Sequence, residues 1–344
     1  MRYLKMWMGT HRNGPSSICS TNMPLAEYIS INKTSLAEHE NGNIGFLFKV
    51  LSVNKPLSIQ SHPNKEEAKV LHARDPTHYP DDNHKPEMAI ALSDFELLCG
   101  FRPSKEIYDN IKSLYISCIE RLTDSNEEKQ REALKIIFSD MMNSATDVIS
   151  TAINSMVEQG THSSFDKLLL RLNCEFPNDI GVFAPLLLNY FTLKKGESVF
   201  LEPNQPHAYL LGDCVECMAC SDNTIRAGLT PKFKDVKTLI SSLSFKMSPP
   251  PYFLAKKLRP GLVEYRPPVK EFAVHEIKHD FDGSTDIGSS SILIVIDGKA
   301  KFVADKEEIF VNKGEVVFLP NNAFVSSIVS SENFLAYRAF TPLK

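Results

Sequence analysis

The sequence has no long hydrophobic run and no excess of one charge. Its longest apolar stretch, residues 183–193, reaches about half the length of a bilayer-spanning helix and contains Pro185 and Asn189. We therefore expect no transmembrane segment. Lys and Arg number 38 against 42 Asp and Glu, which leaves a formal net charge of -4. This near-balance excludes the basic footprint of a protein that binds nucleic acid or an anionic membrane.

Signals of secretion are also absent. Met1 is followed by Arg2 and Lys5 rather than by an apolar run with a small-residue cleavage site, so we expect a cytoplasmic protein. Seven cysteines are an odd number and too sparse for a disulfide framework, and we expect reduced thiols. With 42% hydrophobic and 23% charged residues the composition is globular, and at roughly 150 residues per domain the length predicts more than one domain.

Hydrophobic periodicity divides the chain into strand-rich and helical parts. Residues 1–101 contain strand-length apolar runs between Pro and Asn-Gly turn signals. From Ser104 to Leu122 apolar residues recur at helical spacing, which predicts one helix, and Ser125 with Glu128 predicts the capping box of the next. Further helices are expected over 145–159, 165–174 and 181–190. Strand patterns then continue to the C-terminus.

A ten-residue unit nearly repeats in the second strand-rich part. Lys-Gly-Glu, an apolar strand and a Pro-Asn turn occur at 195–204 and again at 313–322. A glycine turn before such a strand is typical of a jelly roll, and the unit resembles the second conserved motif of cupins. The first copy continues to His207, a metal-ligand residue type, whereas the second continues Ala323-Phe324-Val325. We expect one barrel equipped for chemistry and one structural barrel.

The predicted fold is therefore mainly β, with two cupin-type jelly-roll barrels and an inserted all-helical domain. The helical part is an insertion because strand patterns resume after it. The expected domains are a metal-bearing cupin domain of residues 1–101 plus 180–250, a helical insertion of residues 102–179 and a degenerate C-terminal cupin domain of residues 251–344.

Two short segments offer polar groups to a cavity. If 57–62 is a strand, its period of two puts Ser58, Gln60 and His62 on one face. A hydrogen-bonded core histidine explains that pattern as well as a metal ligand does. Farther along, Pro86 forces an extended backbone, so that Lys85 and Glu87 share one side. The alternative for this pair is a solvated surface ion pair.

Taken together, side chains from three segments form a candidate metal site. They offer two nitrogens and two oxygens, a set that suits zinc or another borderline divalent ion with an open position. The four residues are Gln60, His62, Glu87 and His207. An iron-dependent cupin oxygenase is an alternative on the same scaffold.

A rival metal site lies in 214–220, where Cys214, Cys217 and Cys220 show two successive Cys-x-x-Cys spacings. In a strand, however, Cys217 faces away from the other two, so the sulfurs cannot converge, and we expect buried thiols. The same alternation turns Glu216 inward as a candidate base. The loop that follows has cations that suit a phosphate, although a solvated loop is the alternative. It carries Asp222, Arg226 and Lys232.

Motifs along the chain resemble those of one family. They are Trp-Met-Gly-Thr-His at 7–11, Phe-Leu-Phe-Lys-Val-Leu at 46–51, Gln-Ser-His-Pro-Asn-Lys at 60–65, Asn-His-Lys-Pro-Glu-Met at 83–88, and the segment 212–232. With them the sequence resembles the type I mannose-6-phosphate isomerases, or phosphomannose isomerases, of the cupin superfamily. The resemblance implies an aldose-ketose isomerase that interconverts D-mannose 6-phosphate and D-fructose 6-phosphate through a cis-enediol. The reaction would supply mannose for GDP-mannose synthesis and glycosylation.

The resemblance also implies roles for individual residues. One zinc ion per chain would be bound by Gln60, His62, Glu87 and His207. The catalytic arginine would be Arg226, and other groups around the substrate would be Lys85, Glu216, Asp222 and Tyr209. Phosphate contacts would be Ser58 and Lys232. The implied partner is a small sugar phosphate, with no nucleic acid and no membrane, and we expect a monomer.

Two departures from the family pattern stand near the N-terminus. Lys5 occupies the position two residues before Trp7 where the family typically has Glu, and the family's usual N-terminal segment with Tyr-Ala-Trp-Gly does not precede it. We expect the missing strand to leave a barrel edge exposed and to remove part of the pocket wall. The alternative to an active enzyme is therefore a non-catalytic sugar-phosphate-binding cupin.

Overall fold

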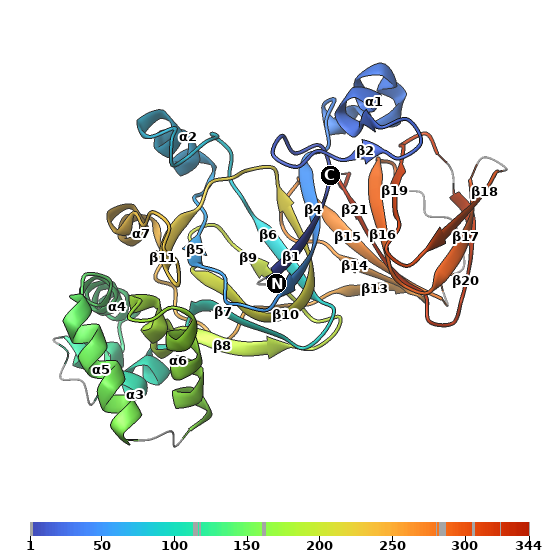
Figure 1. The fold of residues 1–344 in the computed structure, drawn as a ribbon. Coiled ribbons are helices and arrows are strands. Elements are labelled where there is room, and N and C mark those ends of the chain that lie inside the picture. The colour runs from blue at the N-terminus through green and yellow to red at the C-terminus, as the bar shows by residue number, and fades with distance from the viewer. Residues whose placement is uncertain are drawn as a thin grey trace.

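The computed structural model describes the chain except for residues 1–2, 113–115, 117, 160–162, 280, 282–286, 305–306, 324 and 344. A first β unit lies in the middle, with a block of helices on one side of it and a second β unit on the other (Figure 1). The predicted mainly β fold with a helical insertion is confirmed. Among the helices of the described residues, none is long and apolar enough to cross a membrane.

The first β unit is a two-layered network of ten strands. One layer has the order β1-β4-β10-β6-β9-β12, and β5, β7, β8 and β11 belong to the other. The layers pack through a buried cluster that joins Leu51 and Ala89 of the first to Leu97 and Phe191 of the second. The strands are β1 (Tyr3–Met8), β4 (Phe46–Val53), β5 (Ile59–Ser61), β6 (Glu87–Ala91), β7 (Phe95–Phe101), β8 (Leu188–Leu193), β9 (Ser198–Leu201), β10 (His207–Ala219), β11 (Ile225–Gly228) and β12 (Tyr252–Phe253).

The long strand β10 belongs to both layers. Its first residues pair with β5 and β7, and its second half pairs with β4 and β6. Near the change of partners Gly212 has φ +110°, a backbone conformation that other residues rarely adopt. This path brings His207, at the start of β10, to 3.5 Å from Glu87, and it brings Glu216, near the end of β10, to the pocket that Glu87 also lines.

The helical block contains α3 (Ser104–Ile111), α4 (Glu127–Met142), α5 (Thr146–Gln159) and α6 (Ser164–Glu175). The prediction of one helix as far as Leu122 is wrong. The helix ends at Ile111, and Cys118 has a left-handed φ of 60° before a 3-10 turn at Ile119–Thr123. The capping residue of α4 is Asn126 rather than Ser125, since the Asn126 side chain accepts hydrogen bonds from the first-turn amides.

Two other segments differ from expectation. The helix predicted over 181–190 is a 3-10 helix at Ile180–Leu186, followed directly by β8. Among the described residues, three α-helices outside the insertion were not predicted, namely α1 (Leu25–Ile31), α2 (Lys65–Arg74) and α7 (Val236–Ser242). The sequence does contain a signal for α2, because Asn64 and Glu67 form a capping box.

The second β unit repeats the layout of the first. A six-stranded sheet with the order β13-β14-β15-β21-β16-β19 faces a three-stranded sheet, β18-β17-β20. The repeated sequence unit occupies matching places, since β9 pairs with β6 and β19 pairs with β16, and Gly196 and Gly314 share a φ of +86°. The strands are β13 (Lys256–Arg259), β14 (Leu262–Tyr265), β15 (Ala273–Lys278), β16 (Ser291–Asp297), β17 (Lys299–Ala304), β18 (Glu307–Asn312), β19 (Val316–Leu319), β20 (Val325–Ser330) and β21 (Leu335–Phe340).

Candidate active site

A buried cluster of potential metal ligands lies inside the first β unit. The ligand atoms of His62, Glu87 and His207 all lie within 4.8 Å of one another. Glu87 Oε2 is 3.5 Å from the Nε2 atom of each histidine. Gln60 is the register partner of His207, and its amide nitrogen lies 3.4 Å from His207 Nε2. The structure thus brings together the four residues of the predicted metal site.

Hydrogen bonds at the opposite ring nitrogens orient both histidines. His62 Nδ1 lies 2.7 Å from the Asn223 carbonyl oxygen, and His207 Nδ1 lies 3.1 Å from that of Gln205. Because a carbonyl only accepts, each Nδ1 carries a proton, and in the neutral form of each ring Nε2 presents a lone pair toward Glu87. Burial lowers the pKa of His62 to about 4, which keeps the ring neutral.

The cluster fits a divalent ion. His62 Nε2 and Glu87 Oε2 are buried atoms with no hydrogen-bond partner, a costly state for an imidazole and a carboxylate unless something else binds them. Two neutral imidazole nitrogens, a carboxylate and an amide oxygen form a donor set that zinc accepts. Burial alone would raise the pKa of Glu87, but the charge of Lys85 holds it well below its usual range.

Two buried lysine-carboxylate pairs flank the cluster. Lys85 Nζ is 3.1 Å from Glu87 Oε1, and only 12% of the Lys85 side chain is exposed, so the pair is not a solvated surface pair. Lys49 Nζ donates to Glu216 Oε2 at 2.6 Å. Burial would lower the pKa of Lys49, but the Glu216 and Glu87 carboxylates raise it. Lys49 was not predicted, although a lone lysine within the apolar strand 46–53 was an available signal.

Nine of the eleven predicted site residues line one pocket of about 520 Å³. They are Ser58, Gln60, Lys85, Glu87, Tyr209, Glu216, Asp222, Arg226 and Lys232. His62 and His207 lie behind Glu87, against its Oε2 atom. With Lys5, Lys49 and Lys55 the lining holds six cations against three carboxylates, so the pocket favours an anionic ligand.

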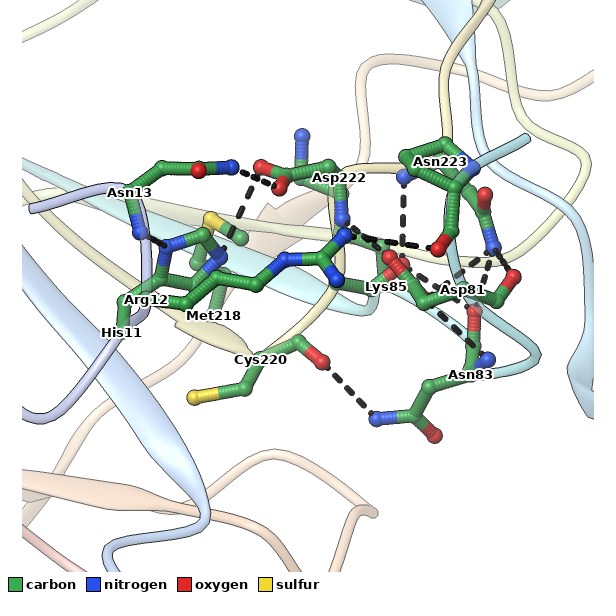
Figure 2. A network of polar contacts seen from close by, with 12 residues as sticks. His11, Arg12, Asn13, Asp81, Asn83, Lys85, Met218, Cys220, Asp222 and Asn223 are labelled. Carbon is green, nitrogen blue, oxygen red and sulfur yellow. Dashed lines mark hydrogen bonds and ion pairs between the residues drawn. The ribbon is translucent and has the colours of Figure 1, made fainter. Parts of the chain in front are cut away.

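Asn223 joins the loop after β10 to the segment that leads into β6. Its side-chain amide donates to the carbonyls of Asp81 and Asn83 at 2.7 and 2.9 Å (Figure 2). Its backbone carbonyl accepts from His62 Nδ1. Asn223 is fully buried. One asparagine therefore aligns a histidine of the cluster with the segment that carries Lys85 and Glu87.

The cysteines do not form the rival metal site. Cys214 packs in the core between the two layers, whereas Cys217 packs in a different core on the opposite face of β10. All seven cysteines are free. Burial raises the pKa of the Cys214 and Cys217 thiols well above the usual value, which is the behaviour of inert structural thiols.

Jelly-roll layers that hold imidazole and carboxylate groups inside the barrel are the arrangement of a metal-site cupin, and the fold and the cluster assign the chain to that class. Comparison with known proteins identifies the family within this class. The chain belongs to the type I phosphomannose isomerase family: residues 2–104 match the model of its catalytic domain, and residues 111–188 match that of its helical insertion domain. The chain is thus an isomerase, which excludes the oxygenase alternative.

Curated relatives are similar along nearly the whole chain. A probable mannose-6-phosphate isomerase of Caenorhabditis elegans is 42% identical and covers 99% of this chain and 86% of its own length. The mannose-6-phosphate isomerase of Homo sapiens is 41% identical, and the match covers 98% of this chain and 88% of the human protein. A solved structure of zinc-bound mannose 6-phosphate isomerase has a TM-score of 0.86 at 29% identity and covers 98% of this chain and 91% of its own.

Proposed function

We propose that this chain interconverts D-mannose 6-phosphate and D-fructose 6-phosphate. The observation that carries the proposal is the pocket with six cations against three carboxylates, directly beside the buried cluster of His62, Glu87 and His207. A sugar phosphate brings a dianionic group into such a pocket, and the surplus of cations attracts it. The names of the curated relatives, mannose-6-phosphate isomerase, support the same substrate.

One zinc ion per chain would be held by Gln60, His62, Glu87 and His207. The orphaned Nε2 and Oε2 atoms and the zinc in the solved relative support this assignment. When bound, zinc acts as a Lewis acid that polarises the oxygens at C1 and C2 of the sugar and stabilises the charge that develops on them.

The isomerisation moves one proton from C2 of the open-chain sugar to C1 through a cis-enediol, while a hydroxyl proton passes from O2 to O1. Glu216 or Lys85 removes the C2 proton and returns it at C1, general acid-base help of about 10²- to 10⁴-fold. Lys49 holds the Glu216 carboxylate at 2.6 Å, and Glu87 holds Lys85. Arg226 stabilises the developing enediolate charge.

The remaining predicted residues orient the substrate. Ser58 and Lys232 bind the phosphate, and Tyr209 and Asp222 contact the sugar. All four line the same pocket as Arg226. Because the phosphate is remote from the reacting carbons, its binding energy positions C1 and C2 rather than taking part in the chemistry.

Replacement of one proposed ligand tests the function. His207→Ala should remove bound zinc, measured by elemental analysis, and abolish formation of fructose 6-phosphate in a coupled assay. His279→Ala, at an exposed histidine of the second β unit, is the matched control and should change neither. Normal turnover after His207→Ala would refute the assignment. Binding of mannose 6-phosphate without product by the unaltered chain would instead identify a non-catalytic binder.

Further features stay predictions. We propose that the chain is a cytoplasmic monomer and that it supplies mannose for GDP-mannose synthesis and glycosylation. We also propose the division into a catalytic cupin domain of residues 1–101 plus 180–250, a helical insertion of residues 102–179 and a C-terminal cupin domain of residues 251–344. The hydrogen-bonded sheets separate between β12 (Tyr252–Phe253) and β13 (Lys256–Arg259), which supports a second unit that begins a few residues after the proposed boundary at 250/251.

A further inference from the structure

Asp222 lies in the wall between two cavities. On one side is the pocket that contains Arg226 and Lys85, and on the other is a second cavity of about 290 Å³. The second cavity is formed partly by the segment that follows β1, including His11 and Arg12. A quarter of the Asp222 side chain is exposed. The carboxylate is therefore accessible to a ligand while it is held from behind.

The segment after β1 holds this carboxylate through two side chains (Figure 2). Asn13 Nδ2 donates to Asp222 Oδ2 at 2.7 Å, and His11 Nε2 lies 3.5 Å from Oδ1. The backbone of the same residue is fixed separately, because the Asp222 amide donates to Asp81 Oδ2 at 2.8 Å. Both carboxylate oxygens thus face partners from a segment more than two hundred positions away in the sequence.

The His11 ring is positioned to donate a hydrogen bond to the Asp222 carboxylate. Its Nδ1 accepts a hydrogen bond from the Asn13 amide at 3.2 Å, so the proton of the neutral ring sits on Nε2, the atom that faces Oδ1. Burial lowers the pKa of His11, which favours that neutral ring. The ring also packs edge-on against Trp7 with centroids 5.3 Å apart, and Trp7 lines the main pocket. The His11 ring is therefore fixed on both sides.

We propose that His11 and Asn13 are positioning residues that hold the Asp222 carboxylate in the orientation in which it accepts a hydrogen bond from a sugar hydroxyl in the main pocket. This inference rests on the proposed isomerase function. An aspartate at a pocket wall otherwise populates several rotamers, and fixing it beforehand removes that entropic cost from substrate binding and from the transition state. Neither His11 nor Asn13 contacts the four proposed metal ligands in the described structure.

The test is a double-mutant cycle on the zinc-loaded full chain. His11→Leu should lower kcat/KM for mannose 6-phosphate about 10- to 100-fold, the effect of a misplaced contact group, while zinc stays at one ion per chain. Asn13→Ala should have a smaller effect in the same direction. His11→Gln keeps an amide donor near the Nε2 position and should restore most of the activity. In the Asp222→Asn background, adding His11→Leu should lower kcat/KM by a further factor of less than about two.

Thr10→Val is the matched control. Thr10 lies in the same segment as His11, and its hydroxyl donates to Asn43 at 2.8 Å rather than to Asp222. The kcat/KM of the Thr10→Val variant should therefore change less than about twofold. If His11→Leu does not fold, Asn13→Ala carries the cycle in its place. The proposal is overturned if His11→Leu or Asn13→Ala lowers kcat/KM by the same factor with and without the Asp222 carboxylate. It is also overturned if neither substitution changes kcat/KM. No turnover by the unaltered chain would instead refute the proposed function.

Discussion

Removal of the Lys49 charge should destabilise the first β unit strongly. Lys49 and Glu216 face each other across β4 and β10 with 2.6 Å between Nζ and Oε2, and their side chains are 8% and 5% exposed. At an effective dielectric constant of about 20, Coulomb's law puts their attraction at about 6 kcal/mol, most of which offsets the cost of burying two charges. Lys49→Met leaves the Glu216 carboxylate buried and unpaired, which should lower the free energy of unfolding by about 3–5 kcal/mol.

Urea unfolding followed by tryptophan fluorescence measures this change locally. Trp7 is the single tryptophan of the chain, and Lys49 Nζ lies 5.4 Å from its ring centroid. Adding Glu216→Gln to Lys49→Met removes the orphaned charge and should recover at least about 2 kcal/mol. Lys194→Met is the control, since Lys194 forms an exposed ion pair whose loss should leave the free energy of unfolding nearly unchanged.

The reasoning is refuted by either of two results. A loss below about 1 kcal/mol for Lys49→Met would mean that the pair is effectively solvated. A double variant that loses the sum of both single effects would mean that the two charges do not interact across the strands. Loss of isomerase activity by Lys49→Met is expected in addition, because Lys49 holds the proposed base in place.

Two further predictions concern the frame around the site. Gly212→Ala should lower the free energy of unfolding by about 3 kcal/mol or more, because a Cβ there would lie 2.3 Å from the Asp94 carbonyl oxygen at a φ of +110°. Gly42→Ala, also at positive φ but in open space, should cost only about 1–2 kcal/mol, and equal losses in thermal unfolding would contradict the steric argument. Burial would raise the pKa of Glu271, but the His84 ring 2.8 Å away lowers it. The Glu271 carboxylate therefore stabilises the fold at pH values above its unfolded pKa near 4.5. This stabilisation is lost as the pH falls through the lower pKa of the folded state. Glu271→Gln should reduce the acid sensitivity in that range, and an unchanged stability profile between about pH 5 and pH 3 would count against the contact.

Much of the site could be predicted because its residues lie in local patterns. The alternation in 57–62 puts Gln60 and His62 on one face, where Gln60 lines the pocket and His62 lies against Glu87, and the repeated Gly-strand-Pro-Asn unit points to His207. Lys49 and His11 were not identified in this way, although the lone lysine in an apolar strand was an available signal. Lys49 looks like an interruption in an apolar strand, and its role depends on Glu216, which lies across β10 only after the sheet has formed.

The errors in the helical block have a different origin. The apolar spacing from Ser104 to Leu122 suits a helix throughout, but the helix ends at Ile111 and Cys118 has a left-handed backbone. Ile111, Ile119 and Leu122 still pack in one buried cluster, so apolar residues at this spacing can share a core without one continuous helix. The cap of α4 shifted by one residue because Ser125 and Asn126 are both good caps, and local propensity does not choose between them.

Sequence alone determined the fold class, the existence of the insertion and the types of residue available for chemistry, because periodicity and residue type are local properties that survive in an unfolded chain. Tertiary structure decided which buried atoms are left without partners, which carbonyl orients each imidazole, and which lysine neutralises each carboxylate. Those facts depend on distances between strands that are far apart along the chain, and only the packed layers set them.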